Sequence, residues 1–497
     1  MLMTYLGTVK TLVYTAVFQI WTPSPYSIRL PALLLGAATI AIFYYALHRA
    51  AGRRAAWIGC ALLATDPVFL QTTVFDWGPV AIQHLMLTGG VALLIRYRQT
   101  RSNLALAAGF FLFGLGLWDK ALFLWMLAGL GVATLAVYPR ELWRAVSLRN
   151  LGLASAALIL GALPLVIYNV AQEGITIRGN AKYSLDPEEL KGKAHLLRVT
   201  LDGSVLFGWM VRENQELQRP FEPVTPLERA ATALSGATGH PRTNWMVAAC
   251  VLALALLPLL WSTPAWRPSV FALVFLIIAW GQMAVTRNTG GSAHHAVLIW
   301  PFPHFLVAVA FAGTAYRFKR AAPSAMAAAT ILLVISNLLV INTFYAQMVR
   351  NRGSLNWSDA IHPLAQTMRT VKADLVFIVD WGMLESLRLL SRGTLPLREG
   401  DLSGGEPLDE DSLREFRRRV AHPSYVFVGH TEGREFFPGR TKQLVSIAQE
   451  IGYEPEMLHV IRESSGMPIF EVFRFRPVSE SQTPQKPDPV SAHRPAG

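Results

Sequence analysis

A long series of apolar segments separated by short polar loops constrains this chain more than any other feature. About ten segments approach the ~20 residues that a helix needs to cross the hydrocarbon of a bilayer. They are 29–47, 55–73, 79–95, 104–117, 121–137, 151–170, 245–260, 269–285, 296–316 and 325–344. Charged residues make up 16% of the 497, fewer than in soluble domains. The sequence therefore predicts a mainly α fold, a polytopic bundle of about ten transmembrane helices.

Arginine and lysine are concentrated in every second loop. Those loops hold Arg49, Arg53 and Arg54, then Arg96, Arg98 and Arg101, then Arg140, Arg144 and Arg149, then Arg267, and finally Arg317, Lys319 and Arg320. Because basic loops stay on the cytoplasmic side, the opposite loops are predicted to be extracytoplasmic. Most of the net charge of +12 then reflects membrane topology, and no nucleic-acid partner is expected. The predicted location is the plasma (inner) membrane.

The rest of the chain is more polar. We predict a membrane domain at 1–345 that includes a large outer loop at 171–244, which is too long to be an idle connection. Strand patterns at 375–379, 425–428 and 469–475 alternate with helical patterns that end near 390 and 451. Residues 346–477 should therefore form a small extracytoplasmic α/β domain. The Pro-, Ser- and Gln-rich stretch 478–497 is predicted to be a disordered tail.

The beginning of the chain does not fit this topology simply. Residues 1–21 are apolar but short and contain Gly7 and Lys10, which indicates a helix lying at the membrane surface. The first span must run inward, so the chain would begin outside with no helix to carry it across. Either this segment inserts in an unusual way or a preceding helix is absent from the sequence. We favour the second explanation.

Asp76 is a carboxylate between two apolar segments, in the turn Phe75-Asp76-Trp77-Gly78-Pro79. A charge at the edge of the hydrocarbon is costly unless it faces water or has a function. Lys10 and Lys120 are lone cations beside outer apolar segments. Each either extends toward lipid headgroups or binds an anionic substrate.

The stretch 287–295 contains Arg287, two glycines, a serine and the pair His294 and His295. Such a stretch can present backbone N–H groups to a phosphate, or it can simply cap the following helix. Adjacent histidines point to different faces of a helix, which makes them a poor metal pair. Arg178, after the sixth apolar segment, is a weaker candidate of the same kind.

Several of these pieces together resemble one family. A helix opens with Ser27-Ile28-Arg29-Leu30-Pro31, a basic turn follows at 51–56, and the next helix ends in Ala64-Thr65-Asp66-Pro67. A later helix ends in Gly114-Leu115-Gly116-Leu117-Trp118-Asp119-Lys120. This order resembles the GT-C membrane glycosyltransferases of the dolichyl-phosphate-mannose protein mannosyltransferase type, glycosyltransferase family 39 and its bacterial relatives. The resemblance covers roughly 5–345.

The resemblance implies an inverting hexosyl- or pentosyltransferase at the outer membrane face. The donor would be a sugar on a polyprenyl phosphate, and the acceptor a lipid, a glycan or a protein. It gives Asp76 the role of base, acceptor-orienting group or metal ligand, and it places Lys120 on the donor phosphate. The family's main catalytic aspartate lies in a first outer loop that this sequence lacks, and residues 8–12 look like its later part.

Other readings stay open. A non-catalytic carrier of lipid-linked sugars would be expected to have inverted repeats and charges near the midplane, and neither is evident. A degenerate relative that only binds its ligand is the other alternative. The residues assign no cofactor, and a divalent cation is expected only if Asp76 is a metal ligand.

Overall fold

The architecture comes from a computed structural model that describes residues 4–75, 77–180, 182–207, 211, 221–287, 290–351, 357–400 and 410–478. Contacts divide the chain into two compact units, Met1–Leu355 and Asn356–Gly497. The helix α18 (Ala322–Asn351) runs past the expected domain boundary at 345, so the two units divide later than the sequence indicated.

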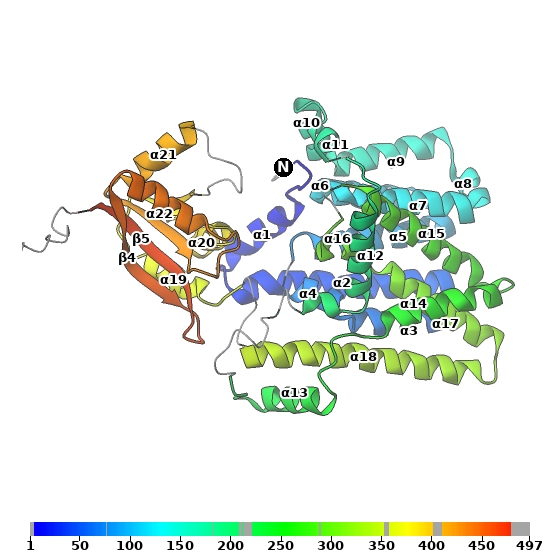
Figure 1. The fold of residues 1–497 in the computed structure, drawn as a ribbon. Helices are drawn as coiled ribbons and strands as arrows, with labels where there is room; N and C mark the ends of the chain where they lie inside the picture. The colour runs from blue at the N-terminus through cyan, green and yellow to red at the C-terminus, as the bar shows by residue number, and fades with distance from the viewer. Residues whose placement is uncertain are drawn as a thin grey trace, which may run out of the picture. The chain divides into compact units, whose positions relative to one another are not determined.

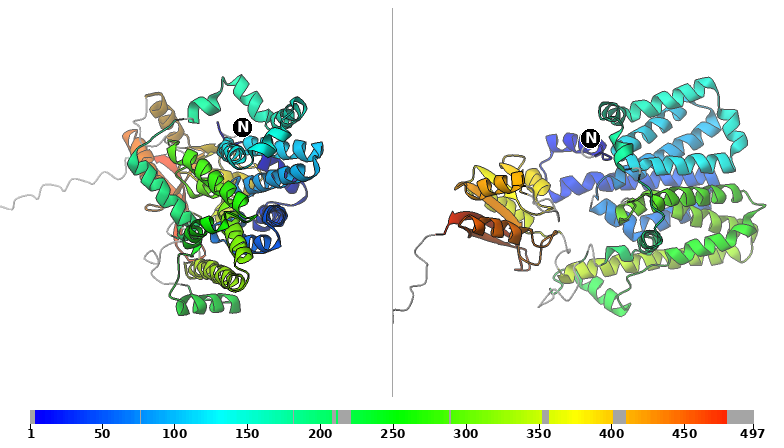
Figure 2. Two further views of the ribbon diagram at one scale, coloured as in Figure 1. Left: turned by 90° about the vertical axis from the view of Figure 1, so that its right-hand side faces the viewer. Right: turned by 45° about the horizontal axis from the view of Figure 1, so that its top comes forward.

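The first unit is a bundle of helices (Figures 1 and 2). Besides α18, its helices up to the large loop are α1 (Val9–Ile20), α2 (Pro25–Ala51), α3 (Arg53–Ala64), α4 (Pro67–Val74), α5 (Val80–Thr100), α6 (Asn103–Asp119), η1 (Ala121–Phe123), α7 (Leu124–Val137), α8 (Pro139–Ala145), α9 (Leu148–Gly161) and α10 (Leu163–Ala171). After the loop come α14 (Met246–Leu256), η4 (Leu257–Leu260), α15 (Trp266–Val285), α16 (Ala293–Ala296), η5 (Val297–Ile299) and α17 (Phe302–Arg317).

The structure does not confirm ten spans. In the described part of the chain, five helices are long and apolar enough to cross a membrane, or seven if each of two bent helix pairs is one span. The predicted span 151–170 is bent by 73° between α9 and α10, where Ala162 ends one helix and Pro164 lies in the first turn of the next. Residues 104–117 and 245–260 lie in shorter apolar helices.

The predicted span 55–73 is two helices, because Asp66 and Pro67 interrupt it. The Asp66 carboxylate accepts a hydrogen bond from the Phe69 amide at 2.6 Å and so caps α4, whose first residue is Pro67. The other carboxylate oxygen lies 3.1 Å from Nε2 of His304, and both side chains are buried. The break is therefore joined to α17.

Helix α17 forms the centre of this unit. Every residue from Phe302 to Ala315 is buried, which explains why the helix is apolar on all sides. It packs against α3, α14, α15 and α18. Just before it, the carbonyl of Val297 lies 2.7 Å from Nε2 of the buried His84 on α5.

The large loop 171–244 has secondary structure of its own. It contains α11 (Ile175–Asn180), α12 (Pro187–Leu201), η2 (Ser204–Leu206) and α13 (Pro226–Ala237). Helix α12 packs on α15 and α16, and α13 packs on α18. The loop therefore adds helices to the bundle.

The second unit contains a five-stranded sheet in the order β2-β1-β3-β5-β4. Its strands are β1 (Leu375–Ile378), β2 (Leu397–Glu399), β3 (Tyr425–His430), β4 (Tyr453–Arg462) and β5 (Pro468–Pro477). Strand β1 is parallel to β2 and β3, and β5 is antiparallel to β3 and β4. The α/β prediction is confirmed for this unit.

Two layers of helices cover the sheet. Residues of α19 (Ile361–Met368) and α20 (Leu384–Leu390) pack with Val376 and Ile378 on one face. Residues of α21 (Glu410–Val420) and α22 (Arg440–Glu450) pack with Phe377 and Phe427 on the other. The sequence did not predict β2, β4, α19 or α21, which are short or rich in charge. The expected tail starts at Val478, and 479–497 lie outside the described residues.

Candidate functional site

Lys120 lies where α6 ends, and the first described residues of the chain pair with it. Leu6 and Lys120 form an antiparallel bridge, flanked by hydrogen bonds from the Gly7 amide to the Asp119 carbonyl and from the Ala121 amide to the Tyr5 carbonyl, both 2.9 Å. The approach requires glycine at position 7, because a Cβ there would lie 1.7 Å from the Trp118 oxygen. The N-terminal segment is thus part of the site.

Asp119 is held beside Lys120 by Gln83 from the first turn of α5. Nε2 of Gln83 donates to the Asp119 carboxylate and to the Gly116 carbonyl, both at 2.9 Å. Gln83 and Asp119 are each 1% exposed. A buried carboxylate with hydrogen-bond donors adds negative potential next to the Lys120 ammonium.

The Lys120 side chain is 2% exposed, and within the described residues its ammonium has no hydrogen-bond or ion-pair partner. Burial lowers the pKa of Lys120 to about 7, although the charge of Asp119 opposes this shift. A buried cation without a partner is costly in free energy. Such a cation at a functional site is available to an anionic ligand.

The histidine pair lies near this ammonium. The charge of Lys120 acts electrostatically on both His294 and His295, whose ring centroids are 4.3 Å apart. Nδ1 of His294 lies 2.7 Å from the Ser292 hydroxyl, and the Gly290 amide donates to Nδ1 of His295 at 3.2 Å. The sequence placed the two rings on different faces of a helix. The two rings nevertheless lie close together on the short helix α16.

Asp76 lies outside the described residues, but its neighbours are described. The ring of Trp77 packs 5.7 Å from that of His294, which brings this turn to the histidine pair. Nζ of the half-buried Lys10 donates to the Gly78 carbonyl at 2.8 Å. Lys10 therefore contacts the backbone of the turn that follows Asp76.

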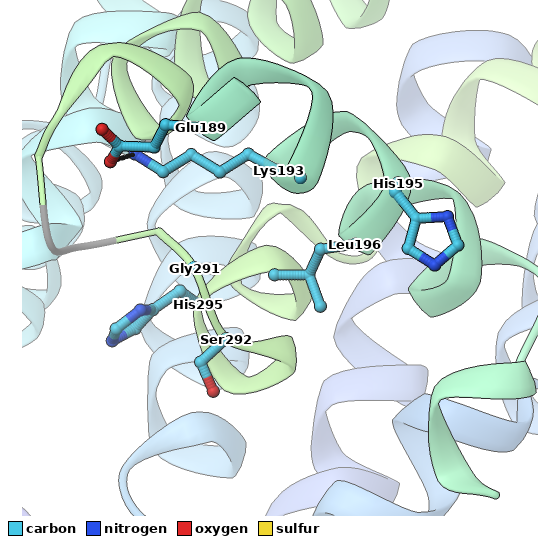
Figure 3. Close-up of a pocket in the computed structure, with 8 residues that line it drawn as sticks. Glu189, Lys193, His195, Leu196, Gly291, Ser292 and His295 are labelled. Atoms are coloured by element: carbon cyan, nitrogen blue, oxygen red, sulfur yellow. Dashed lines mark ion pairs between the residues drawn. The ribbon is translucent and has the colours of Figure 1, made fainter. Parts of the chain in front are cut away.

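A cavity of about 600 Å³ lies next to His295, between α12 and the segment 290–296 (Figure 3). Its polar lining comes from Glu189, Lys193, His195, Ser292 and His295. The ammonium of the buried Lys193 donates hydrogen bonds to the carbonyl of Ala284 at 3.0 Å and to that of Thr286 at 2.5 Å. The same ammonium forms an ion pair with the Glu189 carboxylate at 2.9 Å. It thereby joins α12 to the end of α15. The volume lies within the range of small-molecule sites.

Two residues that the sequence predicted to bind substrate, Arg178 and Arg287, have no described contact with Lys120 or the histidine pair. Arg178 is exposed on α11 and pairs with Glu173 at 3.2 Å, and no described contact joins it to Lys120. Arg287 is exposed, and its amide donates to the Lys182 carbonyl at 2.7 Å. Lys120, His294 and His295 are predicted residues that the described structure brings together, and Lys10 lies beside Asp119, the neighbour of Lys120.

Sequence reasoning missed Gln83, Glu189, Lys193 and the pair of Asp66 and His304. A polar side chain in an apolar segment was a usable signal for Gln83 and His304. Glu189 and Lys193 have the i,i+4 spacing of an ordinary ion pair on a helix surface, so their spacing gave no signal of a site. Among the described residues, no group of three or more His, Cys, Asp or Glu side chains is placed to hold a metal ion.

No protein-family model and no curated protein matches the sequence. The structure is similar to the crystal structure of ArnT from Cupriavidus metallidurans bound to undecaprenyl phosphate, with a TM-score of 0.56 and 13% identity, covering 94% of this chain and 88% of that one. For the same enzyme in the apo state, the TM-score is 0.52 at 15% identity, with 93% and 86% covered.

The chain has the GT-C glycosyltransferase fold. The agreement extends over both units, since more than nine-tenths of the chain is covered. With five or more membrane-capable helices in its described part, this GT-C protein is an integral multi-pass membrane protein. The site described above lies at the ends of α6 and α15 and the starts of α5 and α16.

Proposed function

We propose that this protein is a glycosyltransferase that takes a sugar from a polyprenyl-phosphate donor and transfers it, with inversion, to an acceptor at the extracytoplasmic membrane face. The observation that carries the proposal is Lys120, whose side chain is 2% exposed and whose ammonium has no hydrogen-bond or ion-pair partner among the described residues. Its position at the end of an apolar helix suits the phosphate of a lipid-linked substrate. The bound undecaprenyl phosphate of ArnT, which shares the fold, supports this ligand class.

The chemistry divides between two groups of residues. Displacing a phosphate from an anomeric carbon requires stabilisation of the negative charge that develops on the leaving group. Lys120 is assigned to that phosphate, with His294 and His295 beside it. The acceptor hydroxyl must lose a proton, and Asp76 is assigned as the base that takes it.

Titration of Lys120 gives this assignment a sharp test. With the pKa of free Lys120 near 7, the charged form declines as pH rises, and donor binding should weaken between pH 6 and pH 9. Lys120→Ala should raise the donor Kd roughly ten- to a hundredfold at pH 6, since a hydrogen bond to a charged group contributes ~1.5–3 kcal/mol. Lys120→Arg should keep much of the affinity and lose the pH dependence above pH 7, because the guanidinium stays charged. Near pH 6 some pH dependence should remain, because burial raises the pKa of the adjacent Asp119 to about 6.

The measurement is a titration of nanodisc-reconstituted protein with a polyprenyl-phosphate sugar at several pH values. Lys191→Ala is the matched control, because Lys191 is an exposed lysine on α12. An unchanged Kd in Lys120→Ala would refute the phosphate assignment. Binding without any sugar transfer to lipid, glycan or protein acceptors would instead favour the carrier or the binding-only relative.

A further inference from the structure

In the second unit, one buried carboxylate ties two loops together. Asp380 follows β1 and is 3% exposed. Its Oδ1 accepts hydrogen bonds from the amides of Trp381 at 2.8 Å and Phe437 at 3.2 Å. Its Oδ2 accepts from the Phe436 amide at 2.6 Å and lies 2.7 Å from Nδ1 of His430, the last residue of β3. The loops after β1 and β3 are thus fixed to each other.

These hydrogen bonds hold three solvent-exposed aromatic side chains. Trp381 is 53% exposed, Phe436 41% and Phe437 38%. The ring of Phe436 lies 4.6 Å from that of Trp381 and 4.9 Å from that of Phe437. We call Trp381, Phe436 and Phe437 the aromatic cluster. Large aromatic side chains gathered and exposed on an ordered surface are typical of binding sites.

The cluster lies where this type of sheet binds ligands. Strands β1 and β3 are parallel neighbours, so their carboxyl ends meet at one edge. The chain leaves β1 toward α20 on one face and β3 toward α22 on the other. The two loops diverge at this edge, and open α/β sheets bind ligands at such switch points.

Charges of both signs lie near the aromatic cluster. The Arg440 guanidinium lies 4.0 Å from the centroid of the Phe437 ring, and the charge of Asp380 acts on it. Burial, followed by the negative charges of Glu432 and Glu435, raises the pKa of Glu471, which lies on β5 beside β3. Carboxylates therefore gather beside the loop that holds Phe436 and Phe437. Together with Asp380 they outnumber the Arg440 cation, so an uncharged ligand whose hydroxyl groups donate to them is favoured over a phosphate or an anionic lipid headgroup.

We propose that the aromatic cluster, with His430 beside it, is a binding site for an uncharged saccharide. Aromatic faces pack against the C–H face of a sugar ring, while imidazole and carboxylate groups bind its hydroxyls. Because Asp380 sets the backbone of all three aromatic residues, little conformational entropy is lost on binding. The aromatic cluster belongs to the second unit and Lys120 to the first, and the proposal does not depend on transferase activity.

The test is saturation-transfer NMR on full-length protein in phosphatidylcholine nanodiscs, with cellotetraose and maltotetraose as neutral probes and trigalacturonate as the anionic probe. At least one neutral probe should receive saturation, and trigalacturonate should not. Trp381→Ala and Phe436→Ala should each weaken binding of that probe tenfold or more. Met457→Ala, which removes an exposed apolar side chain on β4, should not. Thermal unfolding checks that each variant is folded.

Three outcomes would overturn the proposal. The first is that neither neutral probe binds the wild-type protein. The second is that binding is undiminished in the double variant in which both Trp381 and Phe436 are replaced by alanine. The third outcome is that brominated lipids quench a measurably smaller part of the Trp fluorescence in Trp381→Ala than in the wild type, which has 14 tryptophans. That result would assign the aromatic cluster to a bilayer surface.

Discussion

The backbone on the C-terminal side of Asp76 is held by side chains from distant parts of the sequence. Lys10 binds the Gly78 carbonyl, and Trp77 packs on His294. The described backbone that follows position 76 therefore lies beside the histidine pair on which the charge of Lys120 acts. Base and phosphate-binding groups need such proximity in order to act on one anomeric carbon.

Asp76→Asn keeps the shape of the side chain and removes its charge. If the carboxylate takes the acceptor proton, transfer should fall by ~10²-fold or more while the donor Kd changes little. Radiolabelled sugar transfer under single-turnover conditions measures the chemical step. Glu188→Gln on α12 removes an exposed carboxylate and should transfer at the wild-type rate. Near-normal transfer by Asp76→Asn would remove this residue from the mechanism.

Among the elements, the broken helix α3–α4 shows how the bundle supports the site. Asp66 ends the apolar segment by capping α4, and it also pairs with His304 on the central helix α17. Helix α16, which carries the histidine pair, is followed by η5 and then by α17. The buried carboxylate of Asp66 therefore connects the break between α3 and α4 to α17, the helix that follows the histidine pair.

Asp66→Ala should destabilise the protein by ~2–4 kcal/mol, because it removes a helix cap and leaves the buried His304 without its acceptor. Asp66→Asn keeps an oxygen acceptor and should lose less. Detergent-induced unfolding followed by circular dichroism gives these differences. Asp186→Ala removes the exposed cap of α12 and should cost only ~1 kcal/mol. Equal losses in Asp66→Ala and Asp186→Ala would show that the pair with His304 contributes nothing.

In the whole membrane unit, the site and the basic loops lie at opposite helix ends. Helix α5 begins beside Gln83 and ends near Arg98, whereas α6 begins near Arg101 and ends at Asp119. Helix α15 begins with Trp266-Arg267 and ends at the carbonyls that Lys193 binds. If basic loops are cytoplasmic, the site faces outward.

Reporter fusions test this orientation. Green fluorescent protein fused after Arg320 should fluoresce, since that loop is predicted to be cytoplasmic. Alkaline phosphatase fused after Val478 should be active, because the second unit is predicted to be outside. The reciprocal fusions serve as controls and should both be inactive. Two junctions that report the same side would contradict the scheme.

The sequence by itself determined the helical membrane architecture and the α/β character of the second unit, and it selected Lys120 and the 287–295 stretch as candidates for substrate binding. These inferences rest on local patterns, because apolar segment length and loop charge depend on neighbouring residues alone. They did not predict the breaks at Asp66 and Ala162, where caps and prolines shorten apparently continuous segments.

Only the tertiary structure decided which polar groups meet. Gln83 reaches Asp119 across 36 positions, Lys193 reaches Thr286 across 93, and Asp66 reaches His304 across 238. A polar side chain in an apolar segment signals that a partner is needed, but the helix that supplies the partner depends on how the bundle packs. Asp380 follows the same rule, since three of its four hydrogen bonds join it to His430, Phe436 and Phe437, which no local pattern places beside it.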